Sequence, residues 1–129
     1  MIGSAIASIL PRHGYRVRVF ERQGATQVRP ANSADEVVRG DLLSGEGLDD
    51  AVKGAQAVLY FAGTSVPATS GDDPTIEFKA SLPPVTNVLN ALVRCNPHAR
   101  FFFPSTGGAI YGSCDSAPCE SSPDRKSVV

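Results

Sequence analysis

The sequence contains an apolar run over residues 57–63 (Ala-Val-Leu-Tyr-Phe-Ala-Gly), in which no polar residue alternates with the hydrophobic ones. A strand with one face in water alternates apolar and polar residues, whereas an unbroken run is typical of a strand that is buried on both faces. Residues 100–105 (Arg-Phe-Phe-Phe-Pro-Ser) form a second such segment. Burial on both faces is usual in parallel sheets that carry helices on either side. These two segments therefore predict an α/β protein.

The rest of the sequence adds helices and strands in alternation. Apolar residues at intervals of three and four indicate helices, and short runs of β-branched or aromatic residues indicate strands. Parallel neighbours need crossover connections, which helices between the strands provide. The order therefore predicts a doubly wound parallel sheet. The further predicted elements are helices over residues 2–10, 48–54 and 83–92 and strands over residues 15–21 and 36–41.

Proline, glycine and serine mark the expected ends of these helices. Pro11 and Gly14 are expected to end the first helix. Ser81 is expected to cap the long helix, with Pro83 and Pro84 in its first turn, where a missing N–H costs no hydrogen bond.

Size and composition favour a single domain. The 129 residues carry a formal net charge of -1 and contain no block of like charges that would indicate a nucleic acid or an anionic membrane as partner. Apolar stretches fall short of the roughly 18 residues that span a bilayer, and no signal sequence is recognisable. We expect a cytoplasmic protein whose domain covers residues 1–112, followed by a loop or disordered tail over residues 113–129.

The cysteines and histidines do not indicate a metal site. Cys95, Cys114 and Cys119 are odd in number and lack the paired spacing of zinc ligands or a redox dithiol, so we expect free thiols. His13 and His98 lie far from one another and from any cluster of carboxylates.

Acidic residues follow two of the predicted strands. Ligands of doubly wound sheets bind outside the carboxyl ends of the strands. Glu21 follows Gly3 at close to the roughly 20-residue interval at which an acidic side chain accepts hydrogen bonds from an adenosine ribose. Asp41 is placed to accept from an adenine amino group. A solvated strand end at Glu21 and a Gly-Asp turn at Asp41 are the structural alternatives.

The helix that begins at Gly3 has unpaired N–H groups and a positive dipole end, which suit a pyrophosphate. A single glycine at a helix start is nevertheless common. Phe61, Ala62 and Gly63 end a strand in small residues that would let a flat ligand approach, or simply form a turn. Ser105 and Thr106 place hydroxyls after the last strand, where they could hydrogen-bond a substrate oxygen or cap a turn. Neither histidine is placed to make either hydroxyl a nucleophile, which disfavours hydrolase chemistry.

Four segments are informative through their order and spacing. They are Met1–Ser4, Arg39–Leu42, Val58–Gly63 and Phe103–Gly112. Together they resemble the extended short-chain dehydrogenase/reductase family, and within it the NAD-dependent sugar-nucleotide epimerases and dehydratases. The resemblance covers residues 1 to about 123 and implies a Rossmann-like sheet and NAD as cofactor. Of the family's Gly-x-x-Gly-x-x-Gly pattern only the final glycine, Gly3, is matched. The first, central strand is therefore expected to be missing, which would leave the strands at 15–21 and 57–61 with unpaired inner edges.

The resemblance also implies individual roles. Glu21 takes the ribose-binding acidic position, where its charge favours NAD over NADP, and the neighbouring Arg22 weakens that preference. The family's catalytic hydroxyl is matched by Thr106, with Ser105 as the second choice, because Gly107 occupies the usual position. The cofactor-binding residues that the resemblance implies are Ile2, Gly3, Glu21, Arg22, Asp41, Leu42, Phe61, Ala62, Gly63 and Ser105.

The family's base, a tyrosine with a lysine four positions later, has no match in this sequence, and the C-terminal substrate domain is expected to be missing as well. We therefore expect a fragment of an NAD-dependent sugar-nucleotide epimerase or dehydratase, an enzyme that works by transient hydride transfer at a sugar carbon, and no turnover from this chain alone. The alternatives are a non-catalytic dinucleotide-binding module and an inactive truncated product. The expected partner is a nucleotide sugar, and the resemblance is compatible with a homodimer.

Overall fold

The computed structural model describes residues 2–25, 35–63, 74–104, 117, 119 and 121–122. The α-helices and strands follow one another along these residues in the order that the sequence predicts. Their order is α1 (Ile2–Ile9), η1 (Leu10–His13), β1 (Arg18–Arg22), β2 (Glu36–Gly40), α2 (Leu48–Val52), β3 (Ala57–Leu59), α3 (Pro74–Cys95) and β4 (Arg100–Phe102).

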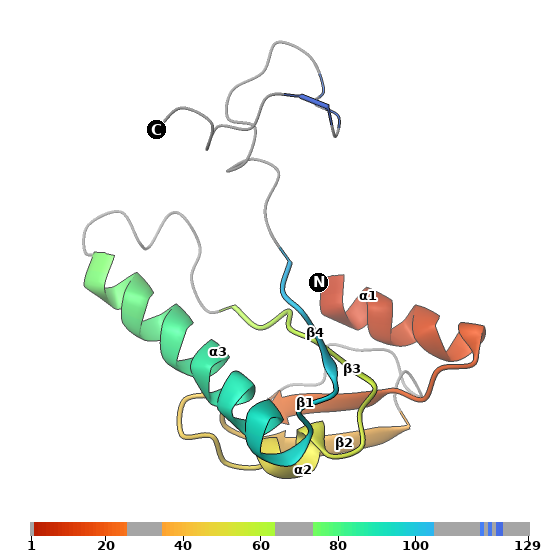
Figure 1. Ribbon diagram of the computed structural model, residues 1–129, viewed down its shortest axis with the longest axis horizontal. Coiled ribbons are helices and arrows are strands. Elements are labelled where there is room, and N and C mark those ends of the chain that lie inside the picture. Colours follow the sequence, from red (N-terminus) through yellow and green to blue (C-terminus); the bar gives the residue numbers. More distant parts are fainter. Residues whose placement is uncertain are drawn as a thin grey trace.

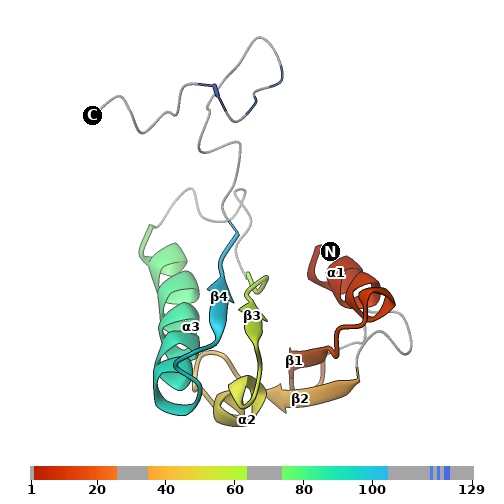
Figure 2. The same ribbon diagram turned by 45° about the vertical axis from the view of Figure 1, so that its right-hand side comes forward.

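The strands form two separate parallel pairs. β1 pairs with β2 from Arg18↔Glu36 to Arg22↔Gly40, and β3 pairs with β4 from Ala57↔Arg100 to Leu59↔Phe102. Within the described residues, β1 and β3 therefore each have one hydrogen-bonded side. This agrees with a sheet whose central position, between β1 and β3, is unfilled. Helices α1 and α3 lie on opposite sides of the β3–β4 pair (Figure 1, Figure 2), and the fold is the expected doubly wound, Rossmann-like α/β arrangement.

The hydrophobic core lies where α3 packs against α2 and the end of β3. Val88, Ala91 and Leu92 of α3 are spaced so that they share one face of the helix, and that face is buried. The other buried members of this cluster are Leu48, Val52 and Tyr60. Phe101 packs against the cluster from β4, and its ring centroid lies 6.1 Å from that of Tyr60.

Gly14 ends the first helical segment, as predicted. Its φ of 80° is left-handed, and its N–H donates to the carbonyls of Leu10 and Pro11. A glycine adopts this conformation without steric cost, so the chain can turn from η1 toward β1.

The predicted start of the long helix is wrong. α3 begins at Pro74, so Ser81 lies inside it, as do Pro83 and Pro84. Each proline removes its own backbone hydrogen bond and its ring crowds the carbonyl four residues earlier, and burial of the α3 face on α2 offsets this cost. Local patterns could not reveal this, because a serine shortly before two prolines resembles a helix start.

All four described strands are shorter than predicted, with β2 ending at Gly40 and β4 at Phe102. β1 begins at Arg18 because the backbone of Val17 is bound by Asp35, whose carboxylate accepts the Val17 N–H at 2.7 Å. β3 ends at Leu59, although the Tyr60 N–H still donates to the carbonyl of Phe102 at 2.9 Å. The predicted tail from residue 113 lies almost wholly outside the described residues. No helix among the described residues is long and apolar enough to cross a membrane.

Candidate functional site

The first turn of α1 lies directly against Phe61, two residues beyond the end of β3. A Cβ atom built on Gly3 would come within 3.3 Å of the Cβ of Phe61, closer than most side-chain contacts. Gly3 and Phe61 were both predicted as site residues, and the structure brings them together. Ile2, beside them, is 68% exposed. The unpaired N–H groups of the first helical turn thus lie beside the carboxyl end of β3.

Glu21 lies near the carboxyl end of β1, opposite Arg39 of β2 in the strand register. Its carboxylate oxygen Oε1 is 3.6 Å from Nε of Arg39. The Glu21 side chain is 16% exposed, whereas that of Arg39 is 66% exposed. Arg39 was missed by sequence reasoning as a partner of Glu21, because the register of two strands separated by a long connection cannot be read from their composition.

The loop after β2 is held in a fixed turn around Asp41. The Asp41 carboxylate accepts the N–H of Leu43 at 3.0 Å, and its carbonyl accepts the N–H of Gly45 at 2.9 Å. The Asp41 N–H in turn donates to the carbonyl of Glu46 at 3.1 Å. This is the turn-forming alternative considered above, so a ligand would find the Asp41 side chain already oriented.

Two glycines make this turn possible. A Cβ atom on Gly40 would lie 2.0 Å from the carbonyl oxygen of Glu46, which no side chain tolerates. Gly47 has a φ of 76° and sits close to the carbonyl oxygen of Arg39. The segment that carries Asp41 and Leu42 is therefore folded tightly back onto the end of β2.

Side chains from distant elements position these loops. Nδ2 of Asn87, on α3, donates to the carbonyls of Leu42 and Leu43, each at 2.9 Å. Nδ2 of Asn96 donates to the carbonyls of Val52 and Ala55 at 2.7 and 2.8 Å. All these contacts span more than 40 positions of sequence, so no local signal could have identified them.

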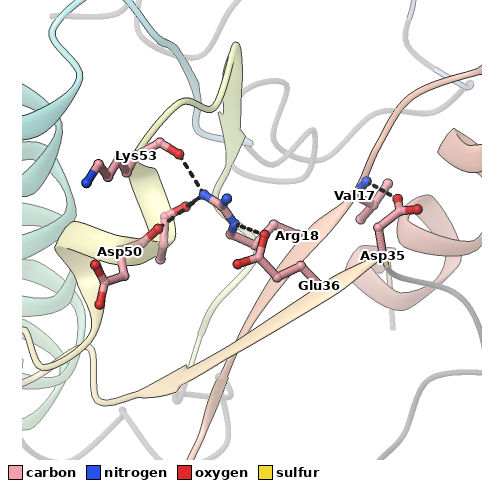
Figure 3. Close-up of polar contacts among 7 residues, drawn as sticks. Val17, Arg18, Asp35, Glu36, Asp50 and Lys53 are labelled. Atoms are coloured by element: carbon pink, nitrogen blue, oxygen red, sulfur yellow. Dashed lines mark hydrogen bonds and ion pairs between the residues drawn. The ribbon is translucent and has the colours of Figure 1, made fainter.

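Arg18 joins β1 to the end of α2 (Figure 3). Its Nη1 donates to the carbonyls of Asp50, Ala51 and Lys53 at 3.1, 3.0 and 2.7 Å, and its Nε lies 2.7 Å from the carboxylate of Glu36. The last carbonyls of a helix lack partners within it and carry a partial negative charge, which a guanidinium satisfies. This network fixes the crossover from α2 into β3.

The other predicted site residues lie at the ends of β3 and β4 or beyond. Phe61 is half-buried, and Ala62 and Gly63 are exposed. A Cβ atom on Gly63 would meet no described atom within 4 Å, so no described neighbour requires a glycine there. Ser105 and Thr106 lie outside the described residues.

Tyr60 and Cys119 are two of the groups whose pKa is shifted. Burial raises the pKa of the Tyr60 phenol, whose ring stacks on Phe103 at a centroid distance of 5.7 Å. Hydrogen bonding from Ser121 and Ser122 lowers the pKa of the exposed Cys119 thiol to about 7. Cys95 and Cys119 are free thiols. No cluster of three potential metal ligands occurs among the described residues.

Comparison with known proteins gives one family. The family described as "NAD dependent epimerase/dehydratase family" matches residues 1–128. A search of curated proteins found no significant match.

Solved structures share the fold. UDP-glucose 4-epimerase of Thermus thermophilus, in complex with NAD, is 28% identical with a TM-score of 0.76, over 97% of this chain and 41% of that one. The crystal structure of gox2253 is 26% identical with a TM-score of 0.73, over 98% of this chain and 38% of that one. A further UDP-glucose 4-epimerase, 24% identical with a TM-score of 0.72 over 89% of this chain and 35% of that one, supports the fold alone. The present chain thus spans about two fifths of the length of these proteins.

Proposed function

This chain belongs to the NAD-dependent epimerase/dehydratase family, and on that premise we propose that it binds NAD and supplies the cofactor-binding part of an enzyme that acts on nucleotide sugars. The observation that carries the proposal is the likeness to the Thermus enzyme, which holds NAD and matches 97% of this chain.

The local geometry at Gly3 fits such a cofactor. A residue with a side chain would press on Phe61 and crowd the first turn of α1, whereas glycine leaves its N–H groups open to a pyrophosphate. We propose that Ile2 and Gly3 bind the pyrophosphate and that Glu21 accepts hydrogen bonds from the adenosine ribose. Asp41 and Leu42 would contact the adenine.

Residues 61–63 would lie along the remaining length of the cofactor, where their small or flat side chains permit close approach. When bound, NAD supplies an acceptor and donor of hydride at a sugar carbon. Thr106, with Ser105 as the second choice, would hydrogen-bond the substrate oxygen that loses its proton in that exchange.

We further propose that residues 1–129 bind without turning over. The sequence has no tyrosine followed four positions later by a lysine, so the family's pair that accepts the proton is not matched in these residues. This same observation favours the second candidate function, a dinucleotide-binding module without catalysis. Turnover of UDP-glucose by residues 1–129, measured by product chromatography, would contradict both the expected inactivity and that second candidate.

Calorimetric titration with NAD tests the proposal. We expect saturable binding by the unchanged chain and a loss of at least about tenfold in Gly3→Val, because the larger side chain displaces Phe61 and covers the N–H groups. Ala5→Val is the matched control, since Ala5 is an exposed residue of the same helix. Undetectable binding at millimolar NAD, or equal binding by the Gly3 and Ala5 variants, would refute the proposed site.

A further inference from the structure

The Glu21–Arg39 pair places opposite charges side by side at the carboxyl ends of β1 and β2. Residues that are register partners in a parallel pair project to the same face, so both side chains emerge together. Arg22, by contrast, is opposite Gly40, and alternation along β1 directs it to the other face. Arg39 is therefore the arginine that accompanies Glu21.

The contact between Glu21 and Arg39 is weak enough for Arg39 to leave Glu21 and bind another anion. The 3.6 Å separation of Nε and Oε1 is longer than a hydrogen bond, and Arg39 is two-thirds exposed. Arg18 offers the contrast, since it lies 2.7 Å from Glu36 and also binds three carbonyls of the α2 segment. The Arg18 guanidinium is thus engaged in contacts that hold the fold. No further partner of Arg39 occurs in the part of the chain that the structure describes.

We infer that Arg39 is a specificity-determining residue that lets the site accept NADP as well as NAD. The inference rests on the proposed function, in which Glu21 accepts hydrogen bonds from the adenosine ribose. A ribose hydroxyl bonded to Glu21 lies about 2.7 Å from a carboxylate oxygen, and the Arg39 guanidinium is 3.6 Å from the same carboxylate. A phosphate on the 2′-oxygen therefore falls within reach of Arg39.

NAD and NADP would each be bound by a different member of the Glu21–Arg39 pair. With NAD, Arg39 stays on Glu21 and the carboxylate accepts the ribose hydroxyls. With NADP, Arg39 leaves Glu21 and binds the 2′-phosphate, for which a guanidinium is well suited because it donates two parallel hydrogen bonds. The expectation that Glu21 favours NAD over NADP holds only for a carboxylate without this partner.

Calorimetric titration of residues 1–129 with NAD and with NADP, at one fixed ionic strength, tests the inference. We expect the two dissociation constants of the unchanged chain to agree within about tenfold. Arg39→Gln should weaken NADP binding by about tenfold or more and leave NAD binding within about threefold. Glu21→Gln should weaken NAD binding and spare NADP binding.

A matched control carries the same loss of charge. Arg94→Gln removes an exposed arginine that pairs with Asp49 on α2, away from the strand ends, and should change neither constant. NAD binding without NADP binding in the unchanged chain, an unaltered ratio of the two dissociation constants in Arg39→Gln, or an altered ratio in Arg94→Gln overturns the inference alone. Failure to bind either cofactor overturns the proposed function and the inference with it.

Discussion

At the residue scale, the backbone around Gly40 sets the shape of the loop that carries Asp41. The carbonyl of Glu46 occupies the space that a side chain at position 40 would need, and Phe20 closes the same space from β1. The residue types Gly-Asp could be read from the sequence as a turn. The close approach of Glu46 could not, because it depends on how the loop folds back onto β2.

Replacing Gly40 with alanine should therefore destabilise the protein by about 2 kcal/mol or more, because the new Cβ meets backbone rather than a side chain that can move. The free energy of unfolding in urea, followed by circular dichroism, measures the effect. Gly63→Ala is the matched control and should change it by less than about 0.5 kcal/mol, since no described atom lies near that position. Equal effects at the two positions would contradict the described loop.

The exposed Cys119 thiol should react readily at neutral pH. The pKa of Cys119 is about 7 because Ser121 and Ser122 hydrogen-bond its thiolate. A lowered pKa means more thiolate at neutral pH, so the rate of Cys119 alkylation by iodoacetamide should reach half its maximum near pH 7. Mass spectrometry of labelled peptides measures this rate. Ser121→Ala should move the midpoint to higher pH, and an unchanged midpoint would exclude the hydrogen bond as the cause.

At the element scale, the sequence predicted the type and order of the described α-helices and strands but missed η1, and not all of the predicted bounds were right. Periodicity identified α1, α2 and the four strands because those signals lie within each segment. The start of α3 and the pairing of Glu21 with Arg39 depend on contacts between segments, which composition does not contain. For the same reason the sequence could not identify the positioning residues Asn87, Asn96 and Arg18. Their side chains hold the site loops and the crossover from α2.

The position of Pro83 inside α3 gives a test at this scale. Alanine is about 3 kcal/mol more favourable than proline in a helix interior, and the more flexible unfolded chain offsets about 1 kcal/mol of that gain. Pro83 is exposed, so Pro83→Ala should stabilise the protein by about 1 to 2 kcal/mol in urea unfolding.

Pro97→Ala, in the turn after α3, is the control and should bring no gain. A neutral or destabilising Pro83→Ala would instead support a helix that starts at this proline.

At the scale of the whole molecule, two parallel strand pairs and flanking helices bring segments from the length of the chain toward the strand ends. The approach of Gly3 to Phe61 and the fixed turn at Asp41 belong to this arrangement. The likeness to an epimerase that holds NAD covers nearly all of the chain. We therefore propose that the carboxyl ends of the strands act as one cofactor-binding surface.

Amide chemical-shift mapping by NMR, with increasing NAD added to the ¹⁵N-labelled chain, tests this claim most directly. We predict saturable shifts at Gly3, Glu21, Asp41 and Phe61, and little change at the end of α3 around Cys95. The absence of shifts at millimolar NAD, or saturable shifts confined to residues away from the strand ends, would contradict it.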